Sequence, residues 1–89
     1  MPEISRFLGI IITMYWYENM IHHTPHFHAR YNEYRCVYSI DDLSVIEGKL
    51  PARIHSYVIE WAQLHLSEPQ ENWNLVVNGK APNHIVPLV

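Results

Sequence analysis

The spacing of apolar residues changes near Leu50 and divides the chain into two halves. Before this point, short runs rich in Ile, Tyr, Val and Phe alternate with turn residues, as β-strands do. After it, apolar residues recur every three or four positions, as in helices with one buried face. The pattern predicts an α+β domain. We expect an antiparallel sheet of about four strands within residues 8–48, then two helices at 51–65 and 68–78 packed on one face, and an extended C-terminal tail.

The first half contains four runs that are predicted to be strands, at residues 9–17, 27–31, 34–40 and 43–47. The first run is apolar on both alternating faces, so a central place in the sheet is expected for it. Asn32 and Glu33 separate the second run from the third, and Asn tolerates the positive φ of a tight hairpin turn. Gly48 is expected to end the fourth strand.

The second half carries helix start and stop signals. Pro51 suits the first position of a helix, and Ser67 with Gln70 fits a capping box at the start of the next one. Asn78 and Gly79 provide the stop signal of the second helix. The apolar residues that follow, including Ile85, are expected to cover a sheet edge or a helix groove.

A two-residue loop at Asn32 and Glu33 determines which residues of the predicted hairpin share a face. One face carries Phe27, Ala29, Tyr31, Tyr34, Cys36 and Tyr38, and we expect it to pack under the helices. The other face carries His26, His28 and Arg30 opposite Ser39, Val37 and Arg35.

Arg30 and Arg35 are directly opposed in this register, which costs up to ~1 kcal/mol unless a negative group bridges them. An anionic partner is one such group. Glu18 or Glu33 could instead supply the counter-charge, or a β-bulge could shift the register. These alternatives have about equal weight on the sequence alone.

Length, charge and cysteine content limit the class of protein. Residues 1–89 are enough for a single domain, and the formal charge of −3 excludes seven histidines that gain charge on mild acidification. The single cysteine, Cys36, forms no internal disulfide, so a cytoplasmic protein is expected. The longest apolar run, residues 8–17, is too short to cross a membrane, and no membrane partner is expected.

Four histidines lie within seven residues, and two residues on a strand that are two apart point the same way, so a metal site is one hypothesis. The candidate ligands for zinc or another divalent metal are His22, His23, His26, His28, His65 and Glu60. The favoured interpretation is that these histidines bond to neighbouring backbone or tyrosines, and no cofactor is predicted.

Catalytic interpretations are weaker than binding ones. Cys36 and His28 are predicted on opposite faces, so they should not form a nucleophilic pair. A histidine and arginine set without metal is typical of small ribonucleases, which move a proton and hold a phosphate. The residues of such a set would be His26, His28, Arg30, Tyr31 and Arg35.

Several motifs resemble a bacterial family known as domain of unknown function 4160 (DUF4160). They are PEISRFLGI at 2–10, MY at 14–15, HTPHFHARY at 23–31, EY at 33–34, GKLPAR at 48–53, EW at 60–61 with His65, and NW at 72–73. The resemblance runs from about Pro2 to Gly79 and covers the single domain.

The resemblance implies a protein partner. Members resemble one half of two-gene pairs, which suggests a toxin–antitoxin component, or accessory subunits beside larger enzymes such as radical S-adenosylmethionine (SAM) enzymes of peptide maturation. We therefore expect a non-catalytic subunit that binds a protein or an extended peptide through its sheet edge and its histidine and arginine face. The expected binding residues are His26, His28, Arg30, Tyr31 and Arg35. A small metal-independent ribonuclease with nucleic acid as its partner, and a metal-binding protein, are the alternatives.

Overall fold

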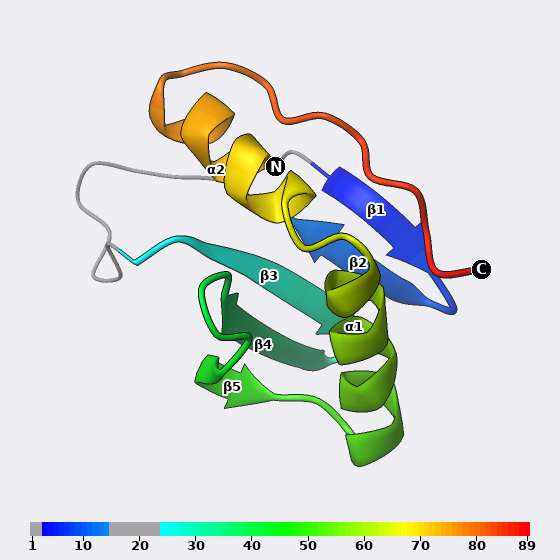
Figure 1. Cartoon of the computed structure of the whole chain (residues 1–89). Helices are drawn as coiled ribbons and strands as arrows, with labels where there is room; N and C mark the ends of the chain where they lie inside the picture. Colours follow the sequence, from blue (N-terminus) through cyan, green and yellow to red (C-terminus); the bar gives the residue numbers. More distant parts are fainter. Residues whose placement is uncertain (1–2, 15–23) are drawn as a thin grey trace.

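The structure is a computed structural model that describes residues 3–14 and 24–89 (Figure 1). In this part of the chain five strands form one antiparallel sheet, in sequence order, and two helices follow. The strands are β1 (Glu3–Phe7), β2 (Ile10–Thr13), β3 (His26–Tyr31), β4 (Tyr34–Ser39) and β5 (Val45–Lys49), and the helices are α1 (Ala52–Leu64) and α2 (Glu68–Val77). The predicted α+β class is confirmed, with five strands instead of about four.

The additional strand is β1, because Leu8 and Gly9 form a turn and do not begin a strand. Their φ angles are 52° and 79°, and positive φ at both positions of a two-residue loop is the type I′ geometry that matches the twist of a hairpin. Phe7 then pairs with Ile10. The predicted strand 9–17 therefore begins one residue later and is the second strand of five, inside the sheet but not central. Its predicted last residues, 15–17, lie outside the described residues.

Gly48 does not end its strand, as the sequence suggested, but lies within β5. Its φ is +79°, and a Cβ atom placed there would lie 2.2 Å from the Arg35 carbonyl oxygen. Only glycine allows the backbone of β5 to approach β4 this closely in that conformation.

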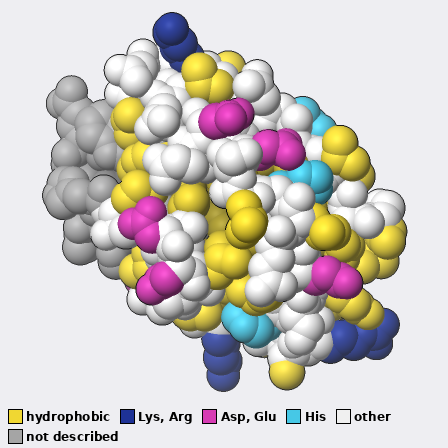
Figure 2. Space-filling model, in the orientation of Figure 1, with side chains coloured by type: hydrophobic (Ala, Val, Ile, Leu, Met, Phe, Trp, Pro, Cys, Tyr) yellow, Lys and Arg dark blue, Asp and Glu magenta, His cyan; other side chains and the backbone are white. Residues whose placement is uncertain are grey.

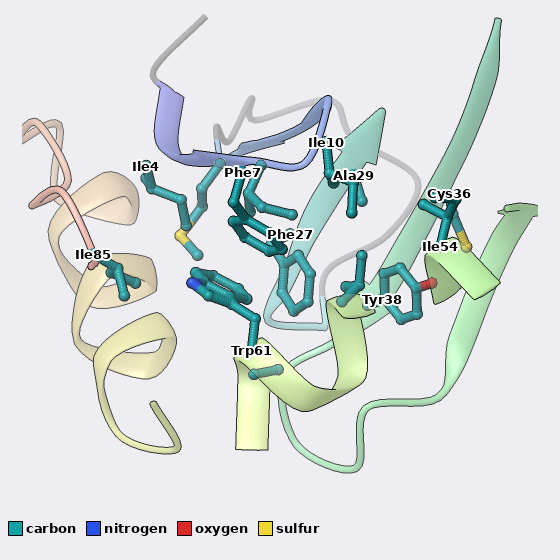
Figure 3. Packing of buried hydrophobic residues seen from close by; sticks show 14 of the residues in the cluster. Ile4, Phe7, Ile10, Phe27, Ala29, Cys36, Tyr38, Ile54, Trp61 and Ile85 are labelled. Atoms are coloured by element: carbon teal, nitrogen blue, oxygen red, sulfur yellow. The ribbon is translucent and has the colours of Figure 1, made fainter. Parts of the chain in front are cut away.

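Trp61 of α1 lies at the centre of the core on the helix-covered face of the sheet (Figure 3). Its ring centroid is 5.8 Å from those of both Phe7 and Phe27, and Phe27 stacks on Tyr38 at 5.3 Å. The buried residues of α1 are Ile54, Val58, Trp61 and Ala62, which confirms the helical spacing of the apolar face. Leu64, which the same spacing placed on this face, is 66% exposed.

The ends of α2 differ in how well they were predicted. Ser67 makes no side-chain capping hydrogen bond, so the predicted capping box with Gln70 is wrong. The C-terminal stop is confirmed, because Asn78 is the C-cap and Gly79 follows with φ +73°.

The C-terminal tail is tied to the rest of the domain by the four hydrogen bonds given below and runs beside β1 (Figure 1). The buried Asn72 amide donates to the Asn83 carbonyl (2.8 Å) and accepts from the Asn83 N–H (2.7 Å). Ile85 N–H donates to the Ile4 carbonyl of β1 (2.7 Å), and the Trp61 indole donates to the Val86 carbonyl (3.1 Å). The expectation that the tail covers a sheet edge is confirmed.

Replacement of Gly48 by alanine should lower the free energy of unfolding by at least about 2 kcal/mol, because a Cβ meets the Arg35 carbonyl and the left-handed backbone disfavours any side chain. Gly79→Ala is the matched control: Gly79 also has positive φ, but no atom lies within 4 Å of its added Cβ. Urea denaturation of both variants measures the difference. Equal losses would show that the contact with β4 does not constrain Gly48.

Candidate functional site

The hairpin of β3 and β4 has the register expected from its two-residue loop. Ala29 pairs with Cys36, Arg30 with Arg35 and Tyr31 with Tyr34, and no register shift interrupts the pairing. The alternative of a β-bulge between these strands is therefore wrong. Of the predicted binding residues, Tyr31 lies on the helix-covered face, and His28, Arg30 and Arg35 lie on the opposite face, called here the outer face. His26 is buried and is described below.

A line of cationic residues crosses the outer face from one edge of the sheet to the other. Arg6 pairs with Ile11, Ile11 with Arg30, Arg30 with Arg35, and Arg35 with Lys49. Directly opposed residues have Cβ atoms about 5 Å apart. Arg6, Arg30, Arg35 and Lys49 form this cationic row, and they are four of the six Lys and Arg residues in the chain.

Only one member of the cationic row has an acidic partner in the described part of the chain. Arg6 binds Glu3 at 2.7 Å; this hydrogen bond lowers the pKa of the Glu3 carboxyl and raises the pKa of Arg6. Within residues 3–14 and 24–89, no ion pair involves Arg30 or Arg35, so Glu33 does not supply the expected counter-charge. Glu18, the other acid considered, lies outside the described residues.

A hollow of about 180 Å³ opens on the outer face along this row. Its apolar side chain is Ile11, and Ala29, whose side chain is in the core, also borders it. Thr13 and His28, which pair with each other, lie beside it. The charged residues that line it are Arg6, Arg30, Arg35 and Glu3. Three arginines and one glutamate give this lining a formal charge of +2, with His28 neutral, although the whole chain is acidic. We call this feature the outer-face hollow.

The helix-covered side has a different charge distribution. Figure 2 shows Asp and Glu side chains spread over this side, while Lys and Arg side chains project at its margins. The cationic row therefore lies on the side of the sheet opposite to this one.

His26 lies in the expected strand position, but its side chain is fully buried. Its Nδ1–H donates to the Thr24 carbonyl (2.7 Å), and its ring centroid lies 4.9 Å from that of Trp73 and 5.3 Å from that of His28. The expectation that His26 forms part of an exposed binding strip is therefore wrong. Its environment is that of a packed histidine bonded to nearby backbone, and His28 is the partly exposed member of the pair.

The candidate metal ligands do not assemble in the part of the chain that can be described. His65 Nδ1 donates to Glu68 (2.9 Å) and its ring packs against Trp61. No group of three or more His, Cys, Asp or Glu side chains suited to a metal occurs among residues 3–14 and 24–89. His22 and His23 lie outside these residues, and a zinc site that includes them stays a hypothesis.

A second polar cluster, on the helix-covered face, links Cys36, Tyr38 and His55. Tyr38 Oη and His55 Nδ1 are hydrogen-bonded at 2.7 Å, and their rings stack at 5.6 Å. Burial raises the pKa of the Cys36 thiol and raises the pKa of Tyr38 strongly. A protonated, buried thiol is a poor nucleophile. Sequence reasoning missed His55, whose only signal was its place one turn from the start of the first helix.

The chain belongs to the family described as domain of unknown function (DUF4160), whose model matches residues 9–74. The match includes four of the five strands and all of α1. Neither the curated proteins nor the solved structures that were compared with the chain gave a match. Among the described helices, none has the length and apolar character needed to cross a membrane.

Replacement of Arg30 or Arg35 by threonine should raise the free energy of unfolding by about 0.5 kcal/mol at low salt, because each change removes a directly opposed like charge. The gain should shrink in 0.5 M NaCl, where the repulsion is screened over about 4 Å. Arg6→Thr is the control and should bring no gain, since it leaves Glu3 without its partner. Thermal denaturation at two salt concentrations tests this; destabilisation at low salt by Arg30→Thr would contradict it.

Tyr38→Phe should lower the free energy of unfolding by about 1 kcal/mol at pH 7, because the bond to His55 is lost. In the wild type, the unfolded chain ionises this phenol near pH 10 before the folded chain does, since burial raises the folded pKa. Stability therefore falls as pH rises through this range. The variant should lose less stability between about pH 9 and about pH 11. Urea denaturation across this range measures the difference. Equal losses of stability in the wild type and the variant would show that the folded pKa of Tyr38 is not raised.

Proposed function

We propose that this protein is a non-catalytic binding subunit that takes up an extended segment of a partner protein as a further strand beside β5. The observation that carries the proposal is the difference between the two edges of the sheet. The C-terminal tail occupies the β1 edge through the hydrogen bond from Ile85 to Ile4. β5 is the other edge, and all of its residues except Ile46 are exposed.

An edge strand presents backbone N–H and C=O groups that can pair with another chain. β5 also offers one apolar and one basic side chain to an added strand. Val45, opposite Tyr38, is 45% exposed on the helix-covered face, and Lys49 lies on the outer face beside Arg35. The segment that suits this edge is extended, with an apolar residue next to Val45 and an acidic residue next to Lys49.

The buried groups support binding in preference to catalysis. Cys36 is buried with a raised pKa, and His26 is fully buried, so two of the groups considered for chemistry are removed from the surface. The setting that we propose is a cytoplasmic complex in which the chain accompanies a larger enzyme, such as a radical SAM enzyme of peptide maturation, or the other member of a toxin–antitoxin pair.

A photo-crosslinking residue placed at Val45 tests this proposal in the native host. Leu64, also exposed and apolar but at the end of α1, is the matched control position. We expect capture of one partner from Val45 and not from Leu64. A peptide of the crosslinked segment should then slow hydrogen exchange in Val45–Lys49 of the isolated protein.

The Asn72→Ala variant separates the two edges, because it removes both bonds between α2 and the tail at Asn83. If the segment binds β5, its affinity should be unchanged in this variant. Tighter binding, with slower exchange in β1, would show that the partner displaces the tail and would overturn the assignment to β5.

A further inference from the structure

We propose that the outer-face hollow is a binding site for a phosphomonoester group. The inference does not depend on the proposed strand addition, because the hollow is lined by β1 to β4 and the open edge is β5. It starts from the charge of the lining, which is +2 after Arg6 and Glu3 are paired. A phosphomonoester carries about −1.5 to −2 at pH 7 and matches this charge, whereas a carboxylate carries half as much.

The arrangement of the arginines also favours phosphate over carboxylate. Arg30 and Arg35 are directly opposed on neighbouring strands, so two guanidinium groups border one side of the hollow. Each guanidinium presents a planar set of N–H donors that suits two oxygens of an oxyanion. The three terminal oxygens of a phosphomonoester can accept from both groups at once, and this would remove the repulsion between them. A carboxylate has only two oxygens and fully satisfies one arginine.

The remaining lining suits a phosphate that is attached to carbon. Thr13 contributes a hydroxyl group, and Ile11 gives an apolar surface for the first carbons of the ester. A volume of about 180 Å³ is below the roughly 300–1,000 Å³ of pockets that enclose drug-sized ligands. The hollow therefore takes the anionic end of a ligand and leaves the rest outside. The ester can be a phosphorylated side chain of a protein segment or a small free phosphomonoester, and both present the same group.

Glu3 sets the affinity of this site. Its carboxylate lines the hollow and binds Arg6, and the Arg6 contact keeps its pKa low, so it is ionised at neutral pH. An incoming phosphate must compete with this carboxylate for Arg6 and is repelled by it. Removal of the Glu3 charge should therefore strengthen binding, and removal of Arg30 should weaken it. General attraction to a basic surface predicts the same two signs, so an arginine outside the hollow, Arg53, is needed to distinguish a specific site from it.

Amide chemical-shift titrations with inorganic phosphate, phosphoserine and acetate, at constant ionic strength, test the proposal. We expect phosphate and phosphoserine to shift the amides around Thr13, Arg30 and Arg35 and to bind more tightly than acetate. Arg30→Gln should weaken phosphate binding by about ten-fold or more, since a charged hydrogen-bonding partner is lost. Glu3→Gln should tighten it several-fold. Arg53→Gln, which removes an arginine of α1 outside the hollow, should leave it unchanged.

Arg35→Gln provides a second loss-of-function variant, and far-ultraviolet circular dichroism confirms that each variant is folded. Equal weakening by Arg30→Gln and Arg53→Gln, no tightening by Glu3→Gln, or acetate binding as tight as phosphate binding would each overturn the site. So would tighter binding of an oligonucleotide with only internal phosphodiesters. A phosphoserine-containing peptide that binds more tightly than free phosphoserine would assign the ester to a protein segment, and equal affinity would assign it to a small molecule.

Discussion

The register of the β3–β4 hairpin is the constraint on which both faces of this domain depend. The two-residue loop at Asn32 and Glu33 closes the hairpin, and Asn32 adopts a φ of 53° that asparagine tolerates better than most residues. In this register Phe27 stacks on Tyr38 under Trp61, while Arg30 meets Arg35 on the other side. A slip of one residue would exchange the faces and place guanidinium groups in the core. The packing of the aromatic residues therefore also places the arginines.

The cationic row extends this pairing across the whole sheet. Because the strands follow one another in sequence order and every pair is antiparallel, residues that are directly opposed form continuous rows across all five strands. Arg6 and Lys49, far from the hairpin in sequence, join Arg30 and Arg35 in this way. The row repels itself at only a small cost per pair, which the buried aromatic core offsets. A fold of this kind can retain an unfavourable charge arrangement on one face as long as the opposite face keeps its packing.

The sequence was sufficient where a local rule decides the structure and insufficient where distant segments meet. The hairpin register and the buried face of α1 followed from loop length and helical spacing. β1 was missed because Leu8 takes a positive φ in the turn, which no residue preference predicts for leucine. Arg6 was thereby lost from the candidate site. The role of Gly48 was misjudged because its closeness to the Arg35 carbonyl is a tertiary contact. The burial of His26 was missed because Trp73, which packs on it, belongs to α2.

Arg35 connects the two proposed binding surfaces. Its side chain lines the outer-face hollow, and its carbonyl lies against Gly48 of the open edge strand. Arg35 also pairs with Lys49, the residue of β5 that would face an acidic side chain of an added strand. A change at Arg35 therefore alters both surfaces at once. Arg30 lines the hollow without pairing with β5, and Val45 belongs to β5 without lining the hollow. These two residues allow the anion site and the strand-addition edge to be judged separately, so that either surface can fail without the other.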